Sequence, residues 1–411
     1  MKQFFKEITR KDALSWAFFD FANSSYYLLI CSFVFPIYFK EVIAGNNMGD
    51  FWWGFSISIS ILLGALFSPI IGAIADYDKK RKRKLIIFTM LSIVGTASLY
   101  FTGSNTLLFA SLVFIATNFF FEIALTIYNS LLPQVSTKET VGLISGFGWG
   151  LGYIGGIAAM LILQPLYAGG IENHLYKFTF PLTALFFLLF SIPAFISIRE
   201  DAETQTKKSI LSLIKIGCSR VFNTIKDIKK YKDIAWFLLA FYFVNDALVT
   251  IFAFVPIYAK TTLSFTVSEI TILLLLVQLI GFPATLFFGW LSDKKGSKKI
   301  LLSTIFIWGM IVILLAVAQT KGLFYFAAIS TGLVVGSSQS IARSWLSKII
   351  PPEKEGEFFG FNGFASKISA TTGPILFGTI SVITANQRIA MISILPFFII
   401  SFIIFARIKE K

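Results

Sequence analysis

The sequence predicts an all-α integral membrane protein in which two related halves each contribute six transmembrane helices. Of its 411 residues, 56% are hydrophobic and 14% are charged, and the mean hydropathy is +0.77. This composition is typical of a chain that folds in lipid. Twelve apolar stretches are long enough to cross a hydrocarbon layer of about 30 Å. They lie near residues 14–40, 51–76, 84–102, 106–132, 140–168, 176–198, 234–260, 268–292, 299–318, 322–349, 356–384 and 388–407.

The first and seventh stretches share a pattern, which indicates an internal repeat. Four residues of the first recur 220 positions later in the seventh: Trp16, Pro36, Tyr38 and Lys40 match Trp236, Pro256, Tyr258 and Lys260. We therefore expect an N-terminal six-helix bundle over residues 1–198 and a C-terminal bundle over residues 234–411. Between them, residues 199–233 are rich in Lys and Arg with apolar residues at helical spacing, which predicts a cytosolic amphipathic linker.

The distribution of basic residues predicts the orientation. Most of the 36 Lys and Arg residues fall on one side if both termini, the linker and the loops after spans 2, 4, 8 and 10 are cytosolic. This arrangement satisfies the positive-inside rule. The net charge of +14 is then explained by topology and anionic lipid headgroups, so no nucleic-acid partner is expected. We expect a monomeric, multi-pass protein of a bacterial inner membrane.

Several kinds of chemistry are not expected. The only histidine, His174, lies in a short outer loop, which argues against a histidine-based metal site or a Ser/His/Asp triad in the membrane. No Gly-rich phosphate-binding loop ending in Lys-Ser/Thr appears, so direct ATP hydrolysis is not predicted. We therefore expect no enzymatic activity, no metal and no cofactor, and energy supplied by a gradient.

Ionisable residues inside the apolar stretches predict a water-filled cavity. Asp20 and Asn23 are three residues apart on one face of span 1, and Glu122 lies between Asn118 and Thr126 at a four-residue spacing in span 4. Such residues normally face a bundle interior or water. Glu122 is the first candidate for a proton-coupling group, with Asp246 and Asp20 as further candidates. The alternative is that Glu122 is satisfied by hydrogen bonds between helices.

Two gating ion pairs are predicted from depth. With a rise of about 1.5 Å per residue, Asp20 and Arg343 lie at similar depths, roughly 9–10 Å from the cytosolic ends of spans 1 and 10. Asp246 and Lys367 both come out nearer the middle of their spans. We expect Asp20 to pair with Arg343 and Asp246 with Lys367. Ion pairs that serve only the structure are an equally good explanation of these residues.

Span 5 is rich in glycine. Gly142, Gly146, Gly148, Gly150, Gly152, Gly155 and Gly156 place small residues along two adjacent faces. This pattern allows close contact between helix backbones. It fits either static packing or a surface on which the two halves rock.

Two loops carry matching motifs. The turn after span 2 contains Gly72, Asp76 and Arg81, and the turn after span 8 contains Gly289, Asp293 and Lys298. A Gly-x-x-x-Asp sequence followed by basic residues, at these two places in a twelve-span chain, resembles the signature loop of the major facilitator superfamily. The first copy departs from the usual pattern, with Tyr77 and Asp78 where that family tends to have Arg and Gly.

Further motifs resemble one branch of that superfamily, the autophagy-related vacuolar amino-acid effluxers and their bacterial relatives. They are Trp16-Ala-Phe-Phe-Asp20-Phe-Ala-Asn23-Ser, Phe35-Pro36-Ile-Tyr38-Phe39, Tyr128-Asn129-Ser-Leu-Leu-Pro133, the glycine-rich run from Ser145 to Gly156, Asn245-Asp246 and Glu357-Phe358-Phe359-Gly360. The resemblance implies a cavity lined by spans 1, 4, 7 and 10. The residues expected there are Asp20, Asn23, Tyr27, Asn118, Glu122, Thr126, Tyr242, Asn245, Asp246, Thr250, Gln339 and Arg343.

The predicted function is secondary active transport of a small organic solute by alternating access, coupled to protons. Charges of both signs near the cavity suit an amino acid or a similar zwitterion. The alternatives are a lipid-handling translocase, a facilitator without proton coupling, and a receptor without transport activity. The expected partners are the solute, protons and the lipid bilayer.

Overall fold

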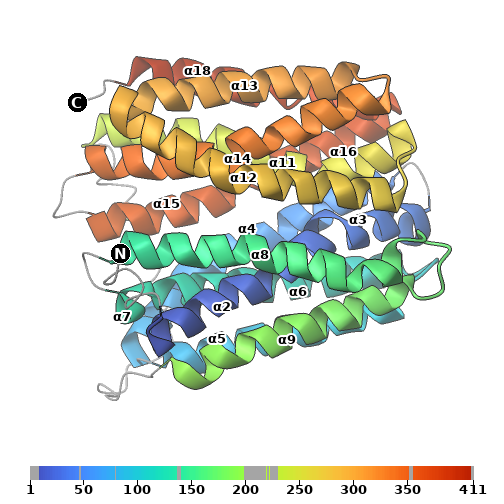
Figure 1. Cartoon of the computed structure of the whole chain (residues 1–411), viewed down its shortest axis with the longest axis horizontal. Helices are drawn as coiled ribbons and strands as arrows, with labels where there is room; N and C mark the ends of the chain where they lie inside the picture. Colours follow the sequence, from blue (N-terminus) through green and yellow to red (C-terminus); the bar gives the residue numbers. More distant parts are fainter. Residues whose placement is uncertain are drawn as a thin grey trace. The chain divides into compact units, whose positions relative to one another are not determined.

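The computed structural model describes residues 9–45, 48–78, 80–136, 140–198, 219, 222, 230–350 and 355–408. These ranges are almost entirely helical (Figure 1), and they contain no β-strand. Ten of the described helices are long and apolar enough to cross a membrane. They correspond to all predicted spans except the tenth and the eleventh. The all-α membrane class is therefore confirmed, while the count of twelve stays a prediction.

The two remaining spans differ from each other. The tenth is one continuous helix of 29 residues, α14 (Lys321–Ile349). The eleventh was expected as a single helix over 356–384 but consists of α15 (Glu355–Ser369) and α16 (Thr372–Thr384). Pro374 lies in the first turn of α16 and accounts for the break before it, because it has no N–H to donate to the carbonyl of Ala370 and its ring would clash with that carbonyl in a continuous helix.

The chain forms two compact units. The first comprises Met1–Tyr38 and Leu63–Arg220. Its main elements are α2 (Lys11–Tyr26), α5 (Arg81–Ser98), α6 (Leu107–Ser130), α8 (Val141–Tyr167) and α9 (Thr179–Ser197), with the short α3 (Val34–Tyr38) and α7 (Leu132–Val135) and the second part of α4 (Gly49–Asp78). In this unit α2 packs against α8 and α9, and α5 packs against α6 and α9.

The second unit comprises Phe39–Leu62 and Val221–Lys411. It contains α11 (Lys232–Leu263), α12 (Val267–Lys295), α13 (Ser297–Val317), α14, α15, α16, α17 (Gln387–Ile392) and α18 (Leu395–Arg407), together with the first part of α4. Here α11 packs against α15, α16 and α18, while α14 packs against α12 and α13.

The two units repeat the same packing. In the first, the helix of span 1 contacts those of spans 5 and 6, and in the second, the helix of span 7 contacts those of spans 11 and 12. This agreement supports the repeat seen in the sequence. The units differ from the predicted bundles in one respect, because residues 39–62 pack with the second half of the chain. Almost all of the predicted linker lies outside the described residues.

Span 1 is an irregular helix. Two π-helical turns, Tyr27–Ser32 and Phe39–Ala44, flank α3. Such turns are rare and often occur at functional sites, because they re-aim the side chains around them. The first begins four residues after Asn23, so the polar residues of span 1 lie immediately before a distortion of the helix.

Local signals fix the ends of several helices. The Thr266 and Glu269 side chains form a capping box at the start of α12, which satisfies two backbone N–H groups. α11 ends at Leu263 and is followed by Ser264, whose φ of 54° lies in the left-handed region. The turn from α12 to α13 is made by Gly296, with a φ of 92°. Glycine adopts that conformation without steric strain.

Candidate functional site

In the first unit, the carboxylate of Asp20 is held by side chains from two elements. The Tyr128 hydroxyl of α6 donates a hydrogen bond of 2.8 Å to Oδ2, and the Asn23 amide donates one of 3.2 Å to Oδ1. Gly148 of α8 lies against the same group, because a Cβ there would be 2.6 Å from Oδ2. Asp20 therefore has a fixed position, and it has no cationic partner among the described residues of its unit.

An aromatic stack fixes Tyr128 itself. The Trp16 and Tyr128 rings are parallel, with centroids 4.4 Å apart, and the Trp16 indole N–H donates to the Tyr128 carbonyl at 3.2 Å. Phe19 stacks on Tyr128 at 4.8 Å. In the sequence, Tyr128 contributes only to the family resemblance, and its contact with Asp20 was not predicted. No local signal connects Tyr128 to Asp20, which lies 108 positions earlier in the chain.

The polar residues Asn118, Glu122 and Thr126 lie on one face of α6, and they contact different neighbours along the helix. Asn118 is buried, and its Oδ1 accepts hydrogen bonds from the Tyr26 hydroxyl at 3.4 Å and the Cys31 thiol at 3.3 Å. Thr126 bonds to the Glu122 carbonyl at 2.9 Å and lies 3.0 Å from the Ser68 hydroxyl. Glu122, between them, is half-buried and packs on Gly64, where a Cβ would lie 2.8 Å from the Glu122 Cβ.

The glycines of α8 make the close helix contact that the sequence predicted. A Cβ at Gly152 would lie 3.0 Å from the Ser24 hydroxyl, and one at Gly155 would collide with the carbonyl of Phe21. Gly146 has open space around it. These contacts are with α2 in the same unit, so static packing accounts for Gly152 and Gly155.

In the second unit, Asp246 is fully buried in α11. Its Oδ1 accepts a hydrogen bond of 2.8 Å from the backbone N–H of Gly373, at the start of α16. Its Oδ2 is buried and accepts no hydrogen bond from the described residues. The predicted ion pair with Lys367 is therefore replaced in this structure by a contact with the N-terminus of α16, which carries a partial positive charge.

Neighbours of Asp246 brace the break between α15 and α16. The Asn245 amide donates to the Ser366 carbonyl at 2.7 Å and to the Ser369 hydroxyl at 2.9 Å. The Tyr242 and Thr372 hydroxyls are 3.0 Å apart. Thr250 bonds to the Asp246 carbonyl at 2.7 Å and also lies against Gly373. Four predicted cavity residues thus converge on the interrupted helix.

The other predicted site residues are placed less specifically. Tyr27 is 41% exposed, Gln339 is half-buried and Arg343 is exposed. Asp20 and Arg343 belong to different compact units, so their pairing stays a prediction.

The loop motifs are only partly described. The surroundings of Gly72 and the side chains of Asp76 and Asp293 lie outside the described part of the structure. Arg81 donates to the Ser130 carbonyl at 3.3 Å, and Lys298 donates to the carbonyls of Ala406 and Ile408 at 2.7 Å each. A Cβ at Gly289 would meet no atom within 4 Å, so this glycine is not required for a close helix contact.

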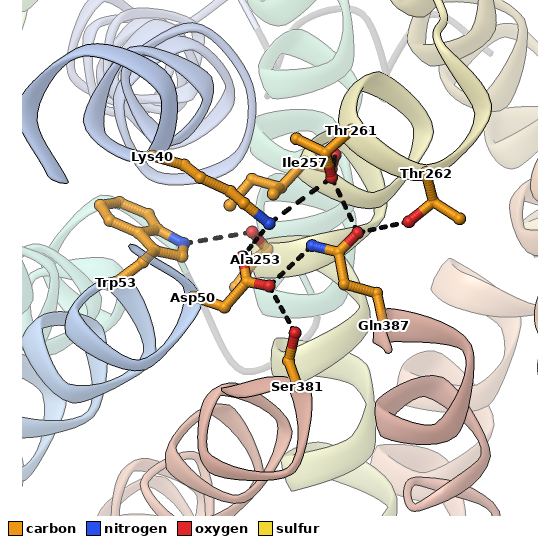
Figure 2. A network of polar contacts seen from close by, with 9 residues as sticks. All are labelled: Lys40, Asp50, Trp53, Ala253, Ile257, Thr261, Thr262, Ser381 and Gln387. Carbon is orange, nitrogen blue, oxygen red and sulfur yellow. Dashed lines mark hydrogen bonds and ion pairs between the residues drawn. The ribbon is translucent and has the colours of Figure 1, made fainter. Parts of the chain in front are cut away.

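A third cluster was not predicted. Lys40 and Asp50, which flank the connection between spans 1 and 2, form an ion pair of 2.6 Å with residues of the second half of the chain around it (Figure 2). Asp50 is 2% exposed. Asp50 lies just outside the predicted span 2, and a carboxylate at the solvated end of a helix needs no partner, so this ion pair was not expected.

Comparisons with known proteins agree with this architecture. Residues 54–411 match the model of the family described as vacuole effluxer Atg22 like. An uncharacterised MFS-type transporter of Bacillus subtilis, YxiO, is 27% identical over 99% of this chain and 96% of its own length. Autophagy-related protein 22 of Kluyveromyces lactis is 24% identical over 85% of this chain and 78% of its own length.

Solved structures show the same fold. The nucleoside transporter NupG matches with a TM-score of 0.71 and 16% identity, over 97% of this chain and 99% of NupG. A bacterial homologue of the human lysosomal transporter Spinster matches with a TM-score of 0.69 and 13% identity, over 98% of this chain and 97% of the homologue. At these identities the likeness establishes the fold alone. The chain thus has the major facilitator fold, and it belongs to the Atg22-like effluxer family.

Proposed function

We propose that this transporter carries a small organic solute, an amino acid or similar zwitterion, by alternating access driven by a proton gradient. One observation carries the coupling to protons. The buried carboxylate of Asp246 accepts a hydrogen bond from a backbone N–H at one oxygen, and no described residue donates to the other. An ionised carboxylate in such a place is costly, and a proton on Oδ2 removes the charge.

The position of Asp246 supports a coupling role. It contacts the first turn of α16 at the break in span 11. Interrupted helices in transporters place polar backbone groups at the sites of substrates and coupling ions. Protonation and release at Asp246 would therefore alter the contact that holds the break. Glu122 and Asp20 are further carboxylates through which protons could pass, and we assign Asp246 the central role.

The zwitterion is supported by the charges available on both halves of the chain. Asp20 and Glu122 lie in the first half, and Arg343 and Lys367 in the second. We propose that the protein is a monomer in a bacterial inner membrane. The distribution of basic residues supports an orientation with both termini in the cytosol.

The proposal is tested with purified protein in proteoliposomes. A panel of labelled amino acids, nucleosides and sugars is supplied with and without an inward proton gradient. We expect gradient-driven uptake of at least one zwitterion by the wild type. Asp246→Asn should abolish uptake driven by the gradient while leaving exchange of solute across the membrane, because exchange needs no net proton movement.

The matched control is Asp233→Asn, which removes an exposed carboxylate at the start of the same helix. It should behave as the wild type does. Full gradient-driven uptake by Asp246→Asn would refute the coupling role of Asp246. Equal uptake by the wild type with and without the gradient would show a facilitator and refute proton coupling altogether.

A further inference from the structure

The cluster around Asp50 joins the connection between spans 1 and 2 to the second half of the chain. Besides its ion pair with Lys40, the Asp50 carboxylate accepts hydrogen bonds through Oδ2 from the Ser381 hydroxyl at 2.6 Å and the Gln387 amide at 2.7 Å. Figure 2 shows these donors converging on Asp50 from different elements. Ser381 belongs to α16, and Gln387 is the first residue of α17.

Gln387 is itself held in place. Its Oε1 accepts hydrogen bonds from Thr261 at 2.7 Å and Thr262 at 2.5 Å, both from the end of α11. Gln387 and Ser381 are 8% and 6% exposed. The partners of Asp50 are therefore fixed in the second half of the chain, whether or not Asp50 contacts them.

Close backbone contacts accompany the polar ones. A Cβ at Gly378 of α16 would lie 2.5 Å from the Asp50 carbonyl, and one at Gly54 of α4 would collide with the carbonyl of Pro374. The Trp53 indole N–H donates to the Ala253 carbonyl of α11 at 3.2 Å. The start of α4 thus fits against α11 and α16 with little space between them.

The two charged residues of the cluster, Lys40 and Asp50, belong to the same one of the two chain segments that meet here. Lys40 and Asp50 both come from the connection between spans 1 and 2, whereas the residues from the second half that bond to Asp50 are neutral. If the contact opened, the ion pair could stay together, and only hydrogen bonds with neutral side chains of the second half would be exchanged for bonds with water. Separation then leaves no buried charge without its partner, which is the costly outcome for an ion pair. The arrangement is therefore suited to repeated opening.

We propose that Lys40, Asp50, Ser381 and Gln387 form a latch that closes the outer end of the transport path and opens once in each cycle. The proposal rests on the proposed transport function. The alternative is a permanent anchor, by which residues 39–62 stay with the second half of the chain throughout. The two differ in whether buried latch residues become accessible from outside under native conditions.

Accessibility can be measured without knowing the solute. The reporter is Ser381→Cys, a small change at a latch residue, in a background with Cys31→Ser and Cys218→Ser. A membrane-impermeant maleimide is applied from outside to intact cells or oriented proteoliposomes. The control reporter is Thr384→Cys, which is exposed one turn further along α16 and should be labelled rapidly in every variant.

Two further substitutions weaken the latch. Gln387→Glu places a second carboxylate beside Asp50. Thr261→Val with Thr262→Val removes the bonds that hold Gln387, together with the 3.5 Å contact between Lys40 and Thr261, without adding charge. Loss of these hydrogen bonds should speed labelling at position 381 by about tenfold, at unchanged labelling of position 384. The valine pair keeps the test valid if the glutamate variant does not fold.

The results separate the proposals. Slow labelling at position 381 that none of these changes accelerates, in folded protein, would establish an anchor and overturn the latch, even if the wild type transports. Accelerated labelling supports the latch even if no tested solute is carried, in which case only the proposed substrate and coupling would need revision.

Discussion

The Tyr128 hydroxyl donates a hydrogen bond of 2.8 Å to the carboxylate of Asp20, 108 positions earlier in the chain. The contact joins the two polar features of the first half, the start of span 1 and the end of span 4. It also separates the roles of the aromatic ring and the hydroxyl, because the ring stacks on Trp16 at 4.4 Å while the hydroxyl binds Asp20.

Tyr128→Phe should therefore keep the aromatic stack with Trp16 but remove the hydrogen bond that holds the Asp20 carboxylate in place. We expect a loss of about 1 kcal/mol in the free energy of unfolding, as for one hydrogen bond, together with a clear fall in the rate of solute uptake. Thermal unfolding in detergent and proteoliposome flux measure the two effects. Tyr100→Phe is the control, since no hydrogen bond from the Tyr100 hydroxyl is seen among the described residues. Unchanged uptake by Tyr128→Phe would show that the position of Asp20 does not matter.

Alanine substitutions at two glycines of α8 should change the stability of the protein in opposite directions. Gly155→Ala forces a methyl group into the Phe21 carbonyl, and should destabilise the protein by about 1–3 kcal/mol, as overpacking does. Gly146→Ala meets open space and should raise stability by up to about 1 kcal/mol, the difference in helix propensity. The two melting temperatures should move in opposite directions, and a shared direction would contradict the packing of α8 on α2.

The sequence was a good guide where a property depends on local pattern. Hydropathy predicted the membrane class, and the spacing of small residues predicted that Gly152 and Gly155 touch another helix. It also contained a signal for the break in span 11, since Pro374 cannot donate a hydrogen bond to the preceding turn of a helix. Span 11 was nevertheless expected to be a single helix, because proline also occurs inside other apolar spans of this chain, such as Pro256 in span 7.

Burial of single polar groups could not be predicted in the same way. Asp50 follows a loop and begins a helix, so its sequence context is that of a solvated residue. Its partners Ser381 and Gln387 are more than 300 positions away, and nothing local connects them. Asp246 was recognised as buried, but its partner was expected to be a lysine side chain. The N–H of Gly373 has no sequence signal of its own, because every residue except proline carries such a group.

Asn245 offers a direct test of the brace at the helix break. Asn245→Leu keeps the approximate size but removes two hydrogen bonds, to the Ser366 carbonyl and to the Ser369 hydroxyl. We expect a loss of about 1–3 kcal/mol in stability and reduced uptake. Tyr242→Phe removes one contact that is largely exposed, with Thr372, and should cost at most about 0.5 kcal/mol. Equal effects of the two substitutions would show that the brace does not depend on Asn245.

Lys298 tests whether the second loop motif has a structural role. Its ammonium group donates to the carbonyls of Ala406 and Ile408 at the end of α18, where the helix carries a partial negative charge. Lys298→Met should therefore lower stability by about 1 kcal/mol, because these carbonyls lose a charged donor. Lys299→Met is the matched control, one residue along the same helix. If the bonds to α18 are the main role of Lys298, uptake per folded molecule should stay near the wild-type rate in both variants. A large loss of uptake with unchanged stability in Lys298→Met alone would instead assign Lys298 to the transport cycle, since its bonds to the end of α18 would then contribute little to the fold.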